Sequence, residues 1–247
     1  TPKVALPAPF PGGAFGSAVS TAGDVNGDGF SDIVIGAPEV SNGQSFEGAV
    51  YVYHGTLFEI DPTPAFAFES NFADRRLGSS VAGVGDVNAN GYYEIAVGAP
   101  GTSAPEVNEG AIYVFYATSA GTTATGHAVL GSNLSGARLG TSVGEAGDVN
   151  GDGYADIIGG APNSTNGENN EGRAWVFLGS PGPLVSFTTL EMNIADELFG
   201  SAVAGGGDVD GDGYSDVMVG APNASPTLTN EGRVFLHRGN NGLSANR

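Results

Sequence analysis

Hydrophobic residues in this chain fall into short runs separated by segments rich in Gly, Asn and Asp. The clearest run, Ala49–Tyr53, places aromatic residues at every second position, with β-branched residues between them. A period of two, with aromatic and β-branched residues, predicts a β-strand. We find no convincing helical period. The pattern therefore predicts an all-β protein built from short strands.

The first 76 residues predict a unit of four strands. A first strand rich in small residues runs from the Phe15-Gly16 pair towards an acidic loop, and small residues suit a crowded inner strand. The second strand is Ile33–Ile35, before a Gly-Ala-Pro sequence, and the third is Ala49–Tyr53. A weaker fourth strand is expected near Ala65–Phe68.

This unit recurs four times at intervals of about 60 residues. The Phe/Leu-Gly pairs begin at Phe15, Leu77, Leu139 and Phe199. The Gly-Ala-Pro sequences begin at Gly36, Gly98, Gly160 and Gly220. A Glu-Gly pair follows each, at Glu47, Glu109, Glu171 and Glu231. Radially repeated four-stranded units predict a β-propeller, whereas a linear β-solenoid usually has much shorter repeats.

We expect one propeller domain over residues 1–247, with repeats at about 15–76, 77–138, 139–198 and 199–247 plus 1–14. The chain is cut between the third and fourth strands of a unit, so the N-terminal Lys3–Leu6 can supply the last fourth strand. That arrangement closes the ring and removes exposed sheet edges. The same cut also permits two chains to pair head to tail into a larger ring. The sequence leaves both arrangements open.

A nine-residue acidic loop lies between the first two strands of every unit. Oxygen-bearing side chains occupy loop positions 1, 3, 5 and 9, and Gly occupies position 6. Calcium takes six to eight oxygen ligands, so we expect up to four Ca²⁺ ions, with position 7 contributing its carbonyl. The candidate ligands are Asp24, Asn26, Asp28, Phe30 and Asp32; Asp86, Asn88, Asn90, Tyr92 and Glu94; Asp148, Asn150, Asp152, Tyr154 and Asp156; and Asp208, Asp210, Asp212, Tyr214 and Asp216.

Two other interpretations of the loops are weaker. Metal-free Asx turns would also favour Asp, Asn and Gly, but they do not require an acid at position 9 in all four copies. An EF-hand needs Glu at position 12 and flanking helices, whereas position 12 here is Ile35, Val97, Gly159 or Val219. The fourth loop has the most carboxylates and the second the fewest, so we expect the fourth to bind tightest and the second weakest.

Composition limits the possible partners. The 247 residues include 27 acids against 8 Lys and Arg, for a net charge of −19. Nucleic acids and anionic membrane surfaces are excluded as expected partners, because binding them requires clustered basic residues. There is no Cys, and no apolar run approaches the roughly 18 residues of a spanning helix.

The sequence motifs that recur at this constant spacing resemble those of the FG-GAP repeat family, known from the integrin α-subunit propeller and related bacterial proteins. The resemblance rests on Phe15-Gly16, Gly36–Pro38, the acidic loop between them and their three counterparts. It implies a propeller with calcium between strands 1 and 2, and partner binding on the opposite face, made by the 2–3 and 4–1 connections. Integrin-type propellers have seven blades and, in animals, carry Cys. The four repeats depart from that pattern and leave the size of the ring open, and the lack of Cys favours a microbial-type relative.

The features predict a calcium-binding, non-enzymatic β-propeller for recognition or adhesion outside the cell or at its surface. The partner would be a protein or a carbohydrate. The alternative is a structural or self-assembling scaffold, in which two chains pair head to tail into a larger ring as a homodimer. An enzyme is disfavoured: Gly140–Gly144 matches G-x-S-x-G, but the nucleophile elbow turns from strand into helix, and this segment lies in a predicted first strand. We expect Glu47 and its counterparts to anchor the 2–3 connection rather than to meet a ligand.

Overall fold

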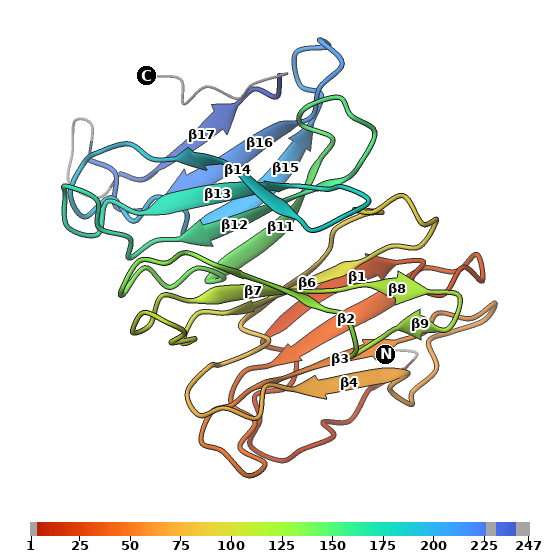
Figure 1. Cartoon of the computed structure of the whole chain (residues 1–247). Helices are drawn as coiled ribbons and strands as arrows, with labels where there is room; N and C mark the ends of the chain where they lie inside the picture. The colour runs from red at the N-terminus through yellow and green to blue at the C-terminus, as the bar shows by residue number, and fades with distance from the viewer. Residues whose placement is uncertain (1–3, 226–230, 241–247) are drawn as a thin grey trace.

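The computed structural model describes residues 4–225 and 231–240, and strands are the only regular elements in these ranges (Figure 1). Four antiparallel sheets follow one another along the chain, each formed by consecutive strands. The predictions of an all-β chain and of repeated sheets are confirmed. In the described residues, there is no helix long and apolar enough to cross a membrane.

The first two sheets each contain four strands, and the second carries a small additional hairpin. The first sheet consists of β1 (Ala18–Gly23), β2 (Asp32–Ala37), β3 (Ala49–Tyr53) and β4 (Phe66–Glu69). The second consists of β5 (Ser80–Gly83), β6 (Ile95–Ala99), β7 (Ala111–Phe115) and β10 (Ala128–Gly131), with the hairpin β8 (Ala117–Thr118) and β9 (Gly121–Thr122).

The third sheet has four strands, and the fourth has three in the described residues. The third consists of β11 (Ser142–Gly147), β12 (Asp156–Ala161), β13 (Arg173–Leu178) and β14 (Val185–Leu190). The fourth consists of β15 (Ala202–Gly207), β16 (Asp216–Ala221) and β17 (Arg233–His237). Each sheet is one blade of a β-propeller, and the blades follow one another in an arc (Figure 1).

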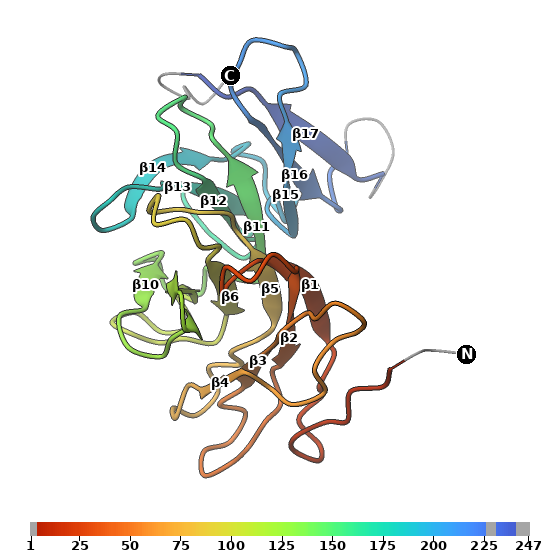
Figure 2. The ribbon, with the colours of Figure 1, turned by 90° about the vertical axis from the view of Figure 1, so that its right-hand side faces the viewer.

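The blades pack face to face through the residues that alternate along their strands. In the first contact, Val50 and Val52 of β3 meet Ile95 and Phe115 of the second blade, and all four are fully buried. The first strands β1, β5, β11 and β15 lie side by side at the centre of the arc (Figure 2). A first strand rich in small residues therefore fits the most crowded position, as the sequence predicts.

Close contacts between glycines of neighbouring blades explain why the Gly-Ala-Pro sequence and the Phe/Leu-Gly pair recur in every unit. A Cβ atom added at Gly36 would lie 2.0 Å from the carbonyl oxygen of Gly78 in the next blade. At Gly98 the corresponding distance, to the oxygen of Gly140, is 1.9 Å, and at Gly160 it is 1.9 Å to Gly200. Backbones approach this closely only where there is no side chain. The Gly-Ala-Pro and Phe/Leu-Gly marks are therefore the two sides of one packing contact.

The expectation that the N-terminal segment completes the last blade is wrong for this structure. Residues 4–14 form no strand, and Leu6 and Phe10 pack against Tyr51 and Tyr53 of the first blade; Lys3 lies outside the described residues. The first and fourth blades lie at opposite ends of the arc (Figures 1 and 2). The segment stays with the nearest apolar face, which belongs to the blade it precedes.

Candidate metal centres

The four acidic loops connect the first and second strands of their blades, as predicted. In the first loop, the position-1 residue Asp24 accepts hydrogen bonds from the amides of the turn it starts. Its Oδ1 accepts from Gly27 N at 2.7 Å and from Asp28 N at 3.1 Å, and its Oδ2 accepts from Gly29 N at 2.8 Å. Asp148 and Asp208 make the same three bonds. This carboxylate therefore fixes the shape of the loop.

The acid at position 9 ties the loop to the rest of its blade. Asp32 is fully buried, and its Oδ2 accepts from Val25 N at 2.9 Å while its Oδ1 accepts from Gly55 N at 2.8 Å. Asp156 bonds the amides of Val149 and Gly179 in the same way. Glu94 and Asp216 repeat the pattern in their blades. Sequence reasoning treated this acid only as a ligand and missed its structural role.

In the first three loops, burial of the position-9 acid disfavours its charged form. Burial raises the pKa of Asp156 to about 7, although hydrogen bonds from Gly179 and Val149 lower it. Burial likewise raises the pKa of Glu94 to about 7 and raises that of Asp32. A divalent cation beside such a carboxylate would offset the lost hydration. The donor set of each loop consists of carboxylate and amide oxygens, which is the set that hard cations prefer.

The fourth loop brings its acids closest together. Asp208, Asp210 and Asp216 each offer a carboxylate oxygen, and these atoms lie within 4.8 Å of one another. In the described residues, this is the only such group of three. Asp212 at position 5 is not part of it, and its Oδ1 accepts from Tyr214 N at 3.0 Å. Positions 1, 3 and 9 of the fourth loop therefore supply the three carboxylates of a candidate cation site.

The other loops differ at position 3, where Asn replaces Asp. In the first and third loops the Asn side-chain amide donates to the position-5 carboxylate, as Asn26 does to Asp28 at 2.9 Å. In the second loop, Asn88 donates to Glu94 at 3.3 Å and Asn90 donates to the Ala117 carbonyl at 2.9 Å. The second loop is therefore the least anionic and the most bound to its own blade.

Arg238 enters the fourth site in a way the sequence pattern does not show. Its guanidinium lies 3.0 Å from the Asp210 carboxylate, just after β17, and its side chain is 64% exposed. The same position holds His54, Tyr116 or Leu178 in the other units. The fourth loop thus has one more carboxylate than the first and third, and one positive charge beside it.

Consecutive loops are hydrogen-bonded to each other. The position-8 amides of Tyr93, Ala155 and Ser215 donate to the position-1 carbonyls of Asp24, Asp86 and Asp148 in the preceding loops. Position 7 contributes to the same contact, because the Tyr92 ring packs against Gly27 and the Tyr214 ring against Gly151. Each of the first three loops is therefore held partly by the next blade.

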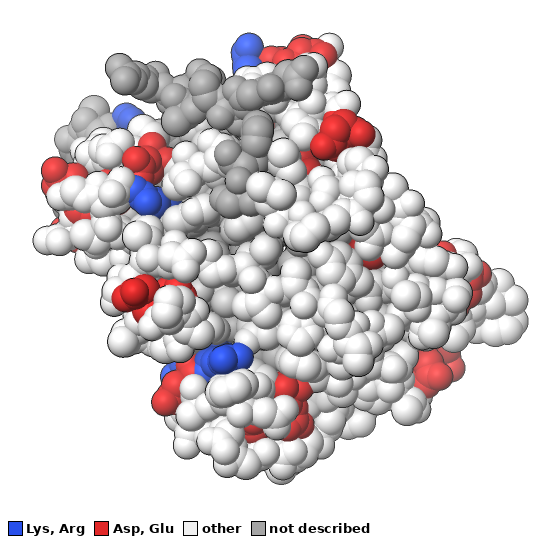
Figure 3. Space-filling model, viewed as in Figure 1, with Lys and Arg blue, Asp and Glu red and all other residues white. Residues whose placement is uncertain are grey.

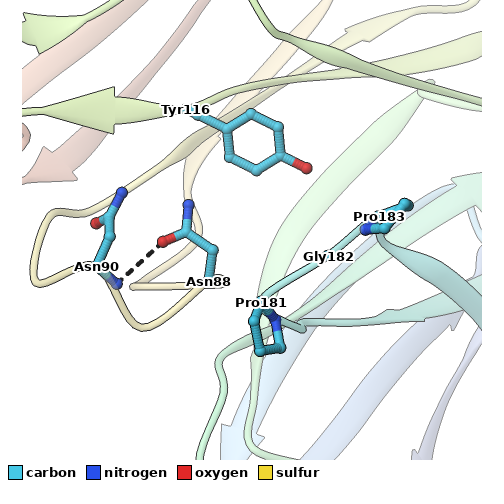
Figure 4. A pocket seen from close by; sticks show the side chains of 6 residues that line it. All are labelled: Asn88, Asn90, Tyr116, Pro181, Gly182 and Pro183. Atoms are coloured by element: carbon cyan, nitrogen blue, oxygen red, sulfur yellow. Dashed lines mark hydrogen bonds between the residues drawn. The ribbon is translucent and has the colours of Figure 1, made fainter.

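An open cavity of about 490 Å³ lies over the second loop. Figure 4 shows Asn88 and Asn90 on one side, the Tyr116 ring above them and the Pro181–Pro183 segment of the next blade opposite. The Asn90 amide donates to Asn88 Oδ1 at 3.0 Å. The second loop is therefore open to solvent at this gap between the second and third blades.

The Glu residues of the Glu-Gly pairs and the Ser of the G-x-S-x-G segment both stabilise the fold. Glu47, Glu109 and Glu171 are buried and accept backbone amides of their own 2–3 connections, from Asn42, Ala104 and Asn166. The interpretation of these acids as anchors is confirmed for the three. In the G-x-S-x-G segment, Ser142 lies in β11 and its hydroxyl donates to the Gly200 carbonyl of the next blade at 2.9 Å. It holds two blades together.

Fold and loops together define a β-propeller whose blades each carry an acidic loop between their first two strands. A family model described as FG-GAP repeat matches residues 15–53, 77–115, 140–177 and 199–237. The chain belongs to the FG-GAP repeat family.

Relatives with this repeat include integrin α chains. Integrin alpha pat-2 of Caenorhabditis briggsae is 34% identical over 85% of this chain and 18% of its own length. Integrin alpha-5 of Xenopus laevis is 31% identical over 90% of this chain and 21% of its own. The chain thus spans about a fifth of the length of these relatives. A Bacillus licheniformis rhamnogalacturonan lyase of solved structure shares the fold, with a TM-score of 0.52, 13% identity, and coverage of 82% of this chain and 40% of its own.

Substitution of Arg238 is expected to strengthen calcium binding at the fourth loop. Arg238→Gln removes a positive charge from beside Asp210, and at a surface site this change is worth roughly threefold to tenfold in affinity. Isothermal titration calorimetry on the variant measures the effect, with Arg76→Gln in a distant connection as the control.

The predicted order of calcium affinity among the four loops is tested by Asp-to-Ala variants at position 1 of each loop. Stronger binding by the second loop than by the fourth would contradict it.

Substitution of Asp156 is expected to destabilise the protein even when no calcium is present. Asp156→Ala leaves two buried amides, of Val149 and Gly179, without their acceptor, at a cost of about 3 kcal/mol. Urea unfolding in EGTA measures it. Asp152→Ala, at an exposed position of the same loop, serves as the control and should change stability little in EGTA. Equal stability of the two variants would show that position 9 acts only through the metal.

Proposed function

We propose that the protein is a calcium-binding, non-enzymatic recognition or adhesion module that works outside the cell or at its surface. Convergence of Asp208, Asp210 and Asp216 at the fourth loop is the observation that carries the proposal. The same loop recurs in every blade, and each loop is bonded to the next. Calcium in such a chain of sites stabilises the arc, and the opposite ends of the blades stay free for a partner.

The described surface also supports a partner other than nucleic acid. Acidic side chains reach the surface in separate small groups, and few Lys and Arg side chains accompany them (Figure 3). A net charge of −19 repels polyanions. Neutral polar or cationic ligands, such as a glycan or a protein surface, suit this distribution better.

A polar cavity of about 370 Å³ marks the proposed ligand face in the second blade. The 2–3 connection contributes Thr102 and the preceding 4–1 connection contributes Arg75, while the buried anchor Glu109 forms part of the wall. The Arg75 guanidinium donates to the Tyr113 hydroxyl and lies 3.8 Å from the Phe72 ring centre. A cation and aromatic rings in one hollow can bind a peptide or a sugar by hydrogen bonds and stacking.

Binding assays on the immobilised chain test this proposal. Extracellular-matrix proteins and a glycan array are applied in calcium and in EGTA, with the wild type, Arg75→Ala and Arg238→Ala. We expect at least one ligand that requires calcium, whose binding is weakened by Arg75→Ala and unchanged by Arg238→Ala. A ligand lost only with Arg238→Ala would place recognition on the calcium loops instead.

A scaffold role is the second candidate, and the incompletely covered outer faces of the first and fourth blades favour it. Val19 on β1 is 67% exposed and Val234 on β17 is 73% exposed. Exposed apolar residues on a sheet face mark an interaction surface. This role and recognition by the connections are compatible, because they use different surfaces.

A further inference from the structure

Neighbouring blades in this chain are joined by one contact that is repeated three times. The glycine of a Glu-Gly pair in one blade forms a parallel backbone bridge with the Phe or Leu of the Phe/Leu-Gly pair in the next. These bridges are Gly48 with Leu77, Gly110 with Leu139, and Gly172 with Phe199. The Leu77, Leu139 and Phe199 side chains are fully buried there. The contact has an accepting side, on the earlier blade, and an inserting side, on the later one.

The accepting side is present but uncovered on the fourth blade. Val234 and Leu236 of β17 are 73% and 46% exposed, whereas Val50 and Val52, at the same positions of β3, are fully buried. A cavity of about 430 Å³ lies there, lined by Gly220 and Gly232 among others. A Cβ atom added at Gly220 would meet only its own sheet, with Ala202 at 3.5 Å as the nearest contact.

The inserting side is uncovered on the first blade. A Cβ atom added at Gly16 would meet nothing within 4 Å, whereas one at Gly78 would lie 2.4 Å from the carbonyl oxygen of Ala49 in the preceding blade. Phe15 is only half-buried, unlike its three counterparts, and Val19 is 67% exposed. The two ends of the arc therefore carry complementary halves of the same contact.

The N-terminal segment adds a second point of complementarity. At the contact between the first and second blades, the rings of Phe66 and Phe68 in β4 lie on the aromatic residues of the second blade. Their ring centres are 5.3 and 4.9 Å from that of Phe115 in β7. In the first blade, Leu6 and Phe10 pack on the equivalent aromatic cluster that includes Tyr53. Residues 4–14 thus take the place of a preceding blade's fourth strand, and a fourth strand is what the fourth blade lacks among the described residues.

The fourth metal loop is also incomplete without a following blade. Val209, at position 2, is 56% exposed, whereas Val25, Val87 and Val149 at the same position are fully buried. In the other loops a position-8 amide from the next blade bonds the position-1 carbonyl. The equivalent donor for Asp208 would be Ser31 of a first blade.

We propose that two copies of this chain join head to tail, the fourth blade of each receiving the Phe15-Gly16 edge of the other. The contact continues the blade interface that the chain already uses three times, so the second copy needs no new kind of surface. Each interface is heterologous, and two of them related by a two-fold axis close a ring of eight blades. The first blade of one copy then covers Val209 and completes the fourth metal loop of the other.

Two single substitutions separate the two halves of the interface without touching the interior of the chain. The tail variant, Gly220→Ala, adds a methyl group that is accommodated in one chain but collides with the incoming Gly16 carbonyl, by analogy with Gly98 and Gly140. The head variant, Val19→Asp, places a charge on an exposed position of β1. Val107→Asp, at a 65% exposed position away from both edges, is the matched control.

Sedimentation equilibrium in calcium at micromolar concentration measures the mass of each. We expect the wild type and Val107→Asp to have twice the 24.7 kDa of one chain. The head and tail variants alone should be monomers with unchanged circular dichroism, weakened in association by at least about tenfold. When they are mixed they should form a dimer, because the intact tail of one meets the intact head of the other. A monomeric wild type, or a head variant that dimerises alone, would overturn the proposal.

Discussion

Removal of calcium with EGTA is expected to lower the melting temperature of the wild-type chain by about 10 to 20 °C. A ligand present at 100 times its dissociation constant stabilises the folded state by about 2.7 kcal/mol per site. Two such sites, in a chain of this size, produce a shift of that order at about 2 to 4 °C per kcal/mol. The physical reason is that each loop holds at least two carboxylates, at positions 1 and 9, and the fourth loop adds a third at position 3; these carboxylates repel one another without a cation.

Differential scanning calorimetry measures this shift, and the readdition of calcium to the chelated protein is the first control. Magnesium at the same ionic strength is the second, because it demands a smaller octahedral site and retains its waters. We expect calcium to restore the melting temperature and magnesium to restore little of it. An unchanged melting temperature in EGTA would show that hydrogen bonds alone hold the loops.

The loops also show how far sequence reasoning extends. Strand positions could be predicted because alternation within Ala49–Tyr53 and the phase of the repeats are local properties. The position-9 role could have been found, since the amide donors Gly55, Ala117, Gly179 and Gly239 follow their acid at a constant interval. The donors follow the third strand of each blade, so the pattern within the loop itself does not contain them.

Features that depend on how the blades are arranged in space could not be predicted from the sequence. The sequence allowed Lys3–Leu6 to complete the fourth blade, because counting residues does not say where the two ends of an arc lie. Arg238 was missed for a similar reason: its partner Asp210 is separated from it by two strands, and no other unit has Arg at that position. The position of the N-terminal segment and the Arg238–Asp210 ion pair are both set by tertiary structure rather than by local propensity.

The alanine substitution with the largest expected effect on folding lies at a blade contact rather than at a metal loop. Gly98→Ala places a Cβ atom 1.9 Å from the Gly140 carbonyl oxygen and 2.3 Å from Ser80 Oγ. Gly98 has no positive φ, so the backbone itself tolerates alanine and only the contact between blades is changed. The second and third blades must separate to admit the methyl group. We expect a loss of at least about 3 kcal/mol, at or above the upper end of the range for overpacked cores.

Urea unfolding in saturating calcium measures this loss, with Gly182→Ala as the matched control. A Cβ atom at Gly182 would meet only Ser180 Oγ, at 3.9 Å, so its substitution should change stability by no more than about 0.5 kcal/mol. Because calcium is present throughout, the difference between the variants reports blade packing and not metal affinity. If Gly98→Ala proved as stable as Gly182→Ala, the close approach of the backbones would not be what holds the blades in register, and the recurrence of Gly in every unit would need another cause.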